Sequence, residues 1–183
     1  MPLSLKQMKK IIAFAGSNSK NSINKQLALY AVSFLEDIEA TVLDLNDFEL
    51  PIYSIDYENE QGIPKNAYKF LEYIKNSDGI ILSLAEHNGA YTAAFKNSFD
   101  WMSRIDGKLW NDKPMLLMAT SPGGRGGATV LEIAKGRFPY MGGNIKAEFL
   151  LPNFYDNFKG RNIVDEKVNN RFRETVTAFE KSI

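Results

Sequence analysis

Lys10–Gly16 (KIIAFAG) is a short apolar run that ends at a glycine, and the polar loop Ser17–Asn24 (SNSKNSIN) follows it directly. The apolar run is typical of a strand that is buried on both faces of a sheet. The loop is dense in hydroxyl and amide side chains. Apolar residues then recur at the three- and four-residue spacing of an amphipathic helix, at Leu27, Ala31, Phe34, Leu35 and Ile38. The succession of strand, polar loop and helix favours a parallel sheet.

This alternation repeats along the chain. Further apolar runs predict strands at Thr41–Leu45, Gly79–Leu84, Pro114–Ala119 and Ile145–Leu151. Helices are predicted after Pro64, after a Thr92 cap, and from about Gly127 to Tyr140. The clearest helical stripe is the last, with Val164, Val168, Phe172, Val176, Phe179 and Ile183. The acidic, turn-rich segment Asn46–Ile63 is interpreted as a surface loop.

Five strands that alternate with helices predict a three-layer α/β/α domain over residues 1–183, with one five-stranded parallel sheet. The expected strand order is the flavodoxin-like 2-1-3-4-5. A dinucleotide-binding Rossmann domain would need a sixth strand and a glycine fingerprint, and the first loop lacks that fingerprint.

Composition excludes several classes of function. Lys+Arg and Asp+Glu both count 22, and no basic cluster exceeds Lys9-Lys10, so no nucleic-acid partner is expected. The chain has no cysteine and one histidine, which excludes disulfides and thiolate chemistry and argues against a metal site. No apolar run approaches the roughly 18 residues of a membrane span, and Met1–Lys6 is too short for a signal peptide. We therefore expect a cytoplasmic protein.

Three loops of unusual composition follow the first, third and fourth predicted strands. In this strand order ligands bind beyond the carboxyl ends of the strands, where the order reverses, and these three loops meet there. The loop Gly16–Asn24 opens a helix, whose first N–H groups and dipole favour an anion, and its neutral donors suit a phosphate monoester that stays bound, as in FMN. The third loop has four glycines in five residues (GGRGG, 123–127), which indicates ligand contact or positive φ angles.

The candidate cofactor-binding residues come from all three loops. They are Ser17, Ser19, Ser22, Ile23 and Asn24 in the first, Glu86, His87, Asn88 and Gly89 in the second, and Ser121, Pro122, Gly123 and Gly124 in the third. No catalytic residue is assigned. His87 is the sole histidine, and we expect it to contact the flavin pocket without being an essential proton donor.

Together these loops resemble the NADPH-dependent FMN reductase family, which includes chromate, quinone and azo reductases. The family's Gly-Ser-x-Arg-x-x-Ser-x-Asn loop is matched at Gly16, Ser17, Ser22 and Asn24, with Ser19 in place of the arginine. Its third signature, Ser-Pro-Gly-Gly-x-Gly-Gly, is matched from Ser121 to Gly127. Its second signature is matched at Asn88, Lys96, Asn97, Asp100, Trp101, Ser103 and Arg104. His87 stands where the family usually has tyrosine, and Ala90–Ala93 replaces Ser-Ile-Pro-Gly.

The resemblance implies an oxidoreductase that transfers hydride from NADPH or NADH to FMN and electrons onward to a quinone, flavin, azo compound or metal oxyanion. The alternative is a flavodoxin-like electron carrier without enzymatic activity. Such carriers usually need a charged docking face, and the zero net charge of this chain argues against one. A response-regulator receiver is rejected because Ala15-Gly16 and Ala85-Glu86 offer no acidic cluster at the strand ends.

Quaternary structure is predicted from one aromatic-rich region. The helix after Gly89 carries Phe95, Phe99, Trp101 and Met102, with Trp110 just beyond it. These positions point in several directions around the helix. Their combined aromatic surface is larger than one face of a sheet can bury. We therefore expect an exposed aromatic patch and a homodimer or homotetramer.

Overall fold

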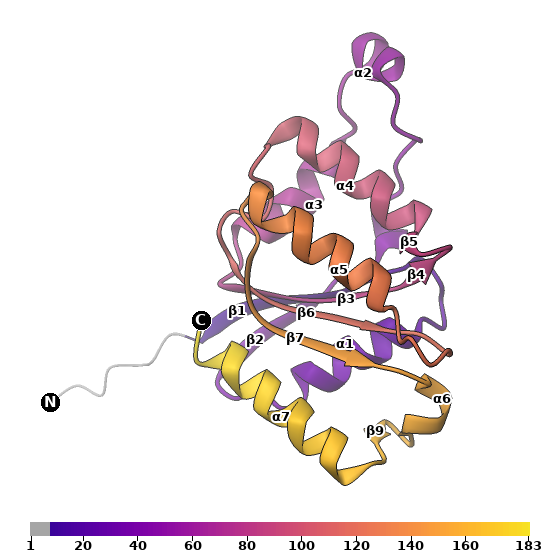
Figure 1. Ribbon diagram of the computed structural model, residues 1–183. Helices are drawn as coiled ribbons and strands as arrows, with labels where there is room; N and C mark the ends of the chain where they lie inside the picture. The colour runs from indigo at the N-terminus through magenta and orange to yellow at the C-terminus, as the bar shows by residue number, and fades with distance from the viewer. Residues whose placement is uncertain (1–7) are drawn as a thin grey trace, which may run out of the picture.

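A five-stranded parallel sheet forms the centre of the computed structural model, which describes residues 8–183 (Figure 1). Its order is β2-β1-β3-β6-β7, so the predicted order 2-1-3-4-5 of the core strands is confirmed. Helices α3, α4 and α5 cover one face, while α1 and α7 cover the other. Met1–Lys6, used above to argue against a signal peptide, lies outside the described residues.

The secondary structure alternates as the sequence predicts, with two small additional hairpins. The strands are β1 (Lys9–Gly16), β2 (Ile38–Val42), β3 (Gly79–Leu84), β4 (Glu86–His87), β5 (Ala90–Tyr91), β6 (Pro114–Thr120), β7 (Asn144–Leu151), β8 (Phe158–Lys159) and β9 (Asn162–Ile163). The helices are α1 (Ile23–Val32), α2 (Ile55–Gln61), α3 (Lys65–Lys75), α4 (Ala93–Ile105), α5 (Ala128–Arg137), α6 (Phe154–Asn157) and α7 (Glu166–Glu180), with short 3₁₀ turns η1 (Leu45–Asp47) and η2 (Phe138–Met141).

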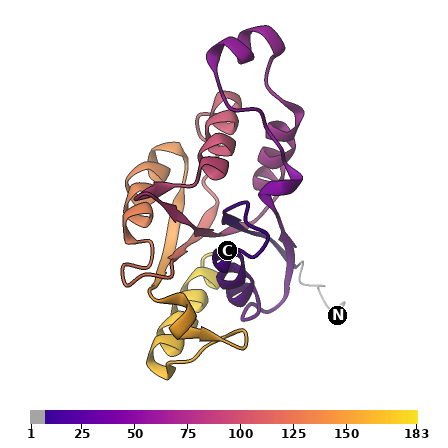
Figure 2. The same ribbon diagram turned by 90° about the vertical axis from the view of Figure 1, so that its right-hand side faces the viewer.

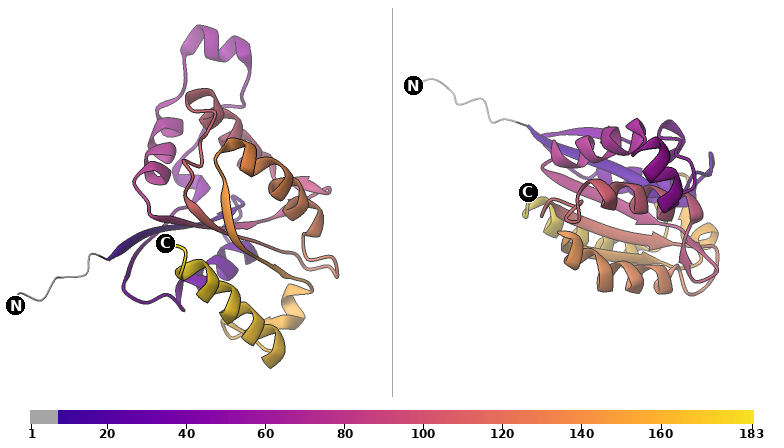
Figure 3. Two further views of the ribbon diagram at one scale, coloured as in Figure 1. Left: turned by 60° about the vertical axis from the view of Figure 1, so that its left-hand side comes forward. Right: turned by 90° about the horizontal axis from the view of Figure 1, so that it is seen from above.

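Alternation along the central strands fills two separate cores. In β1, Ile12 and Phe14 belong to the core under α3, α4 and α5, while Ile11 and Ala13 belong to the core under α1 and α7. Every residue of β3 is buried, as expected for a parallel strand with helices on both faces. Each large apolar side chain buried in this way contributes about 1.5–3 kcal/mol. The carboxyl ends of β1, β3 and β6 are thereby fixed at one edge, which Figure 2 faces and which lies opposite the C-terminus in Figure 3.

The predicted boundary between the first helix and the second strand is wrong. The helix ends at Val32, because Ser33 caps it and its hydroxyl turns back to donate to the carbonyl of Tyr30 (2.7 Å). Phe34 and Leu35 pack against the core from the connecting turn. The strand starts at Ile38 rather than Thr41, since Ile38 pairs with Lys9 and carries the register along β1.

Two further expectations about surface segments are corrected. Asn46–Ile63 is more than a loop: it contains part of η1 and the whole of α2, and it buries Phe48 (4% exposed). Figure 1 shows α2 standing clear of the rest of the protein. At the other end, Val164 does not join the stripe of the last helix, because Asp165 caps α7 by accepting the N–H of Val168 (2.9 Å). Val164 is 53% exposed, and Ile183 lies beyond the end of α7.

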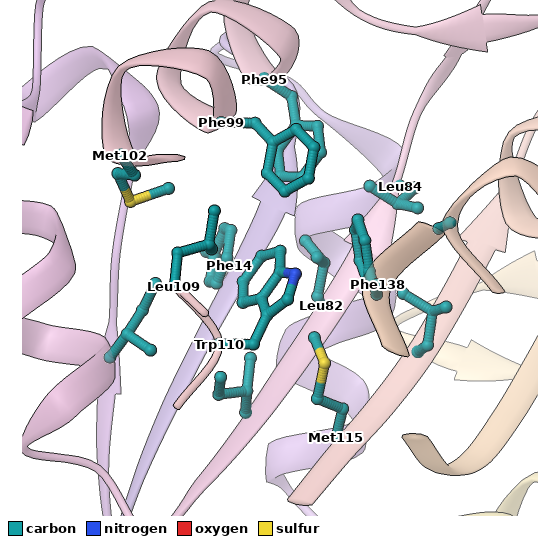
Figure 4. Packing of buried hydrophobic residues seen from close by; sticks show 14 of the residues in the cluster. Phe14, Leu82, Leu84, Phe95, Phe99, Met102, Leu109, Trp110, Met115 and Phe138 are labelled. Atoms are coloured by element: carbon teal, nitrogen blue, oxygen red, sulfur yellow. The ribbon is translucent and has the colours of Figure 1, made fainter. Parts of the chain in front are cut away.

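The expected exposed aromatic patch on α4 is also wrong. All of its members are buried: Phe95, Phe99, Trp101, Met102 and Trp110. Figure 4 shows Phe95, Phe99 and Trp110 packed with Phe138 over the sheet. Trp101 packs against the segment between β2 and α3, with the ring of Tyr53 4.9 Å from its own and its indole N–H donating to the carbonyl of Pro51. Across residues 8–183, no helix has the length and apolar character needed to cross a membrane.

Candidate functional site

The three predicted loops converge on one hollow of about 320 Å³ at the carboxyl edge of the sheet. We call this hollow the cradle. The predicted site residues that line it are Ser17, Ser19, Ser22, Ile23, Asn24, Glu86, His87, Ser121 and Pro122. Asn88, Gly89, Gly123 and Gly124 are not in its lining. The lining has one carboxylate and neither lysine nor arginine, so an anion held here would rely on neutral donors.

The first loop presents such donors at the start of α1. Ser22 caps the helix, its Oγ accepting the N–H of Lys25 (3.1 Å). Ser17 Oγ accepts the N–H of Ser19 (3.1 Å). Because both oxygens accept hydrogen bonds from the backbone, their own O–H groups remain able to donate. The first-turn N–H groups of Ile23 and Asn24 have no acceptor within residues 8–183, and the helix dipole adds positive potential there.

Asn24 is a structural cross-link more than a ligand donor. Its side chain is buried (2% exposed), and its Nδ2 donates to the carbonyl of Thr120 (3.1 Å). Its Oδ1 accepts from the backbone N–H of Thr120 (3.0 Å) and from the hydroxyl of Ser83 (2.7 Å). The amide thus joins α1 to the ends of β3 and β6. The side chain of Asn24 therefore holds the site together, and its backbone N–H, which has no acceptor within residues 8–183, is a donor that it offers toward the cradle.

Lys25, next along α1, is also committed elsewhere. Its ammonium pairs with the carboxylate of Asp44 at 2.6 Å. Partial burial raises the pKa of Asp44, but hydrogen bonds from Lys25 and from Asn46 outweigh burial and hold that pKa below its ordinary value. The charge of Lys25 is therefore neutralised within the protein, which leaves the helix start and the serines as the anion-binding groups.

The second loop is a small hairpin, β4–β5, that the sequence analysis did not predict. Asn88 and Gly89 form its two-residue turn with φ angles of 52° and 73°, as a type I′ turn requires. An Asn-Gly pair is a strong signal for such a hairpin, and this signal was available in the sequence. Glu86 lines the cradle, but its carboxylate accepts the N–H of Val130 (2.9 Å) in the first turn of α5. That hydrogen bond ties the second loop to the helix that follows the third.

The glycines of the third loop divide into two pairs. Gly126 and Gly127 have φ angles of 61° and 84°, and a Cβ at Gly126 would lie 2.9 Å from the backbone of Pro152. Packing and conformation explain these two. Gly123 and Gly124 have no such φ, and a Cβ there would meet nothing closer than 3.9 and 3.8 Å. The fold itself does not require glycine at 123 or 124, which points to a ligand that approaches the bare backbone closely.

Four residues line the cradle that the sequence analysis did not select: Asn21, Ala85, Thr120 and Tyr155. Tyr155 is the most informative, because it comes from α6 and is 64% exposed at the mouth. The two residues before Tyr155 are held by the third loop: Asn153 N donates to Gly123 O (3.0 Å), and Phe154 N donates to Ser121 O (3.0 Å). No local pattern marks this residue, so only the tertiary structure reveals it.

Residues of the second signature hold a different part of the protein. Asn97 on α4 donates to the carbonyls of Leu50 (3.3 Å) and Pro51 (3.0 Å) and accepts the N–H of Tyr53 (2.8 Å). The indole N–H of Trp101 donates to the same Pro51 carbonyl (2.7 Å). These side chains therefore anchor the chain between β2 and α3 and do not line the cradle.

Fold and cradle together define a class of protein: a parallel α/β domain with a polar hollow at the carboxyl edge of its sheet, where the strand order reverses and ligands of such folds bind. The chain belongs to the NADPH-dependent FMN reductase family, whose model matches residues 9–156. It is accordingly an oxidoreductase that uses FMN and a reduced nicotinamide nucleotide.

Individual relatives agree with this assignment. The chain is 33% identical over 134 residues to a 2-hydroxy-1,4-benzoquinone reductase from Burkholderia sp., covering 72% of this chain and 71% of that protein. It is 29% identical over 122 residues to a quinone reductase of Escherichia coli K12, covering 64% and 63%. Among solved structures, the NAD(P)H:acceptor oxidoreductase FerB from Paracoccus denitrificans superposes with a TM-score of 0.76 at 25% identity, over 95% of this chain and 96% of that one.

Proposed function

We propose that the cradle binds the phosphate of FMN and that the enzyme reduces a small quinone with NADPH or NADH. When bound, FMN supplies the chemistry of accepting a hydride and releasing its electrons to an acceptor. The observation that carries the proposal is the pairing of free first-turn N–H groups at Ile23 and Asn24 with glycines at 123 and 124 that packing does not require. The first feature suits a phosphate, and the second suits a flat group lying against a backbone.

The chain's own residues have three tasks in this function. Ser17 and Ser22 donate hydroxyl hydrogens to the phosphate, since their oxygens already accept backbone N–H groups. The Glu86 carboxylate fixes the second loop to α5 and so sets the width of the cradle. His87 lines the cradle and is exposed, and we assign it contact with the ring system without a required proton transfer.

A quinone is the acceptor that the family relatives favour, because the Burkholderia and Escherichia proteins are both quinone reductases. The chain would operate as one domain over residues 1–183. Its compartment would be the cytoplasm, where a reductase of this family finds reduced nicotinamide nucleotides.

The test measures FMN affinity by quenching of flavin fluorescence, together with NAD(P)H oxidation in the presence of benzoquinone. We expect the parent protein to release FMN rather than FAD on denaturation. The double variant Gly123→Ala/Gly124→Ala keeps its thermal stability but binds FMN at least about tenfold more weakly, because the added methyl groups occupy the space of the ring. Gly107→Ala is the matched control, since a Cβ there meets nothing within 4 Å.

Three outcomes would contradict the proposal. Unchanged FMN affinity in the double variant would place the flavin elsewhere. FAD as the main released cofactor would contradict the phosphate assignment. FMN binding without NAD(P)H oxidation would contradict the assigned reaction and favour an electron carrier.

We also propose a homodimer or homotetramer, on different grounds from the buried aromatic residues of α4. Exposed apolar side chains gather on the segment that carries α2, where Ile52 is 87%, Ile55 51% and Tyr57 37% exposed. Apolar exposure of this kind is typical of an interface. Light scattering at micromolar concentration tests this, and the mass of a monomer would contradict it.

A further inference from the structure

A second hollow, far larger than the cradle, lies on the outer side of the layer formed by α1 and α7. Its volume is about 960 Å³, against about 320 Å³ for the cradle. It is bounded by the outer face of α1, the β8–β9 hairpin and α7, and its lining shares no residue with the cradle. We call it the arginine groove, after Arg161 on the hairpin and Arg173 on α7.

The floor of the arginine groove is aromatic. The ring of Tyr30 lies 4.8 Å from that of Phe34 and 5.4 Å from that of Phe158, nearly perpendicular to both. The hydroxyl of Tyr30 is bound to Asn169 Oδ1 (2.7 Å), which holds the ring in place. Tyr30 and Phe158 are each only 7% exposed, so the apolar surface that the groove offers to a ligand comes mainly from Leu29, which is 42% exposed, and from the partly buried Phe34.

The charge at the arginine groove has a single sign. Its lining contains Arg161 and Arg173 and no acidic residue. Within residues 8–183 neither guanidinium has an ion pair; Arg173 lies 5.1 Å over the ring of Phe34, and Arg161 has no polar partner. Planar guanidinium groups of this kind match carboxylates, sulfonates and phosphates.

Arg161 also occupies a backbone position that disfavours its side chain. Gly160 and Arg161 form the two-residue turn between β8 and β9, with φ angles of 56° and 67°. Such a turn strongly favours glycine at its second position. A non-glycine residue there costs roughly 1–2 kcal/mol. The Arg161 side chain has no compensating polar contact within the described residues, which favours a role for it in binding a ligand.

We propose that the arginine groove binds a soluble organic anion with an apolar body, such as an aromatic carboxylate or sulfonate. Leu29 and Phe34 contact the apolar body, while Arg161 and Arg173 take the anionic group. The site is separate from the flavin cradle and is open when FMN is bound.

The experiment uses the FMN-loaded protein and titrates it with naphthalenesulfonate, followed by calorimetry and by NMR. We expect saturable binding that excess FMN does not displace. Arg161→Gly removes the charge and relaxes the turn, and Arg173→Met keeps the packing over Phe34 without the charge. Each variant weakens binding at least about tenfold. The matched control is Arg171→Met, because Arg171 lies on the same helix, 5.2 Å over the ring of Phe149, outside the arginine groove.

Several results would overturn the proposal. Equal binding of neutral naphthalenemethanol would show that the charges do not matter. Displacement by FMN would place the probe in the cradle, and equal loss in Arg171→Met would show nonspecific attraction. A smaller mass by light scattering in the Arg161→Gly/Arg173→Met double variant would make the arginine groove an interface between copies of the chain. FMN content and NAD(P)H oxidation stay unchanged in every variant, so these readouts separate this test from that of the flavin site.

Discussion

The cradle and the segment from Leu45 to Ile63, which we call the protruding segment, are both polar, turn-rich stretches that follow strand ends. They are held in place in different ways. The cradle is fixed by buried hydrogen bonds between backbone and side chains at strand ends, with Asn24 at the centre. The protruding segment is anchored to α4 by Asn97 and Trp101, while α2 has no buried residue. Similar composition therefore yields a loop fixed by buried hydrogen bonds in one place and, in the other, a segment whose helix α2 buries no residue.

This difference matters for function because a cofactor site needs fixed donors, whereas an element with few buried contacts opens easily. Variants at the anchors of each region should therefore give distinct results. Loss of a cradle anchor should reduce global stability, and loss of an anchor of the protruding segment should act mainly on that segment.

The largest effect is expected from Asn24→Ala. The change leaves the N–H and carbonyl of Thr120 and the hydroxyl of Ser83 without their partner in a buried setting. We expect the free energy of unfolding to fall by at least about 3 kcal/mol, with loss of FMN retention as a consequence. Urea denaturation with and without FMN measures both.

The matched control for Asn24→Ala is Asn21→Ala. Asn21 lines the same cradle but is exposed, and its side chain has no hydrogen bond within residues 8–183. Its stability should change by no more than about 0.5 kcal/mol. A cost below about 1 kcal/mol for Asn24→Ala would show that the cross-link is not what fixes the cradle.

The sequence predicts the cradle well because its position follows from topology. Parallel strands bring their carboxyl ends to one edge, so loops far apart in the sequence must meet there, as the hydrogen bond between Asn24 and the N–H of Thr120, 96 residues away, illustrates. Composition then identifies the lining residues of the first loop and, in the third loop, Ser121 and Pro122. Composition does not show which residues of these loops contact a ligand and which serve the fold. Nothing in the sequence separates Gly123 from Gly126, or marks Asn24 as a cross-link.

The protruding segment could not be predicted in the same way. Its contacts depend on side chains about 50 residues downstream, where Trp101 meets Pro51. A helical wheel of α4 suggests too many aromatic residues for one face, and the inference of an exposed patch followed. Trp101 is buried because the chain around Pro51 folds back over it. Local periodicity carries no information about such a long-range contact. Tyr155 at the mouth of the cradle was missed for the same reason.

The two tryptophans of this region give the next prediction. Both are fully buried, but the indole N–H of Trp101 donates to Pro51 O at 2.7 Å, while that of Trp110 has no partner within the described residues. Replacement by phenylalanine removes similar ring volume at each position. We expect Trp101→Phe to lower the free energy of unfolding by about 1 kcal/mol more than Trp110→Phe, because only the first loses a hydrogen bond. Chemical denaturation of the pair measures the difference.

Hydrogen exchange distinguishes the local effect of Trp101→Phe from a general one. Amides of the protruding segment should exchange faster in this variant, while those of β3 follow only the change in global stability. Equal losses in both variants, with no added exchange in the protruding segment, would mean that the Pro51 hydrogen bond does not anchor it.

The smallest effect concerns pH and Glu58 on α2. Its carboxylate accepts hydrogen bonds from Arg104 Nε (2.8 Å) and from the hydroxyl of Tyr53 (3.0 Å). The hydrogen bond from Arg104 is the main cause that holds the pKa of Glu58 below its ordinary value, against the effect of desolvation. A carboxyl whose pKa is lower in the folded protein stabilises it fully above the pKa of the unfolded chain. That stabilisation is lost as the pH falls through the folded pKa.

We therefore expect the protruding segment to loosen on acidification below about pH 4, before the rest of the protein changes. NMR signals of the Trp101 indole N–H and the Tyr53 amide, followed from about pH 7 downward, report this, since both groups are hydrogen-bonded at the anchor. Glu58→Gln should remove the transition, and Glu60→Gln, on the same helix and without an ion pair within residues 8–183, should retain it. An unchanged transition in Glu58→Gln would assign the acid sensitivity to other carboxylates, and Glu58 would then not contribute to the attachment of the protruding segment.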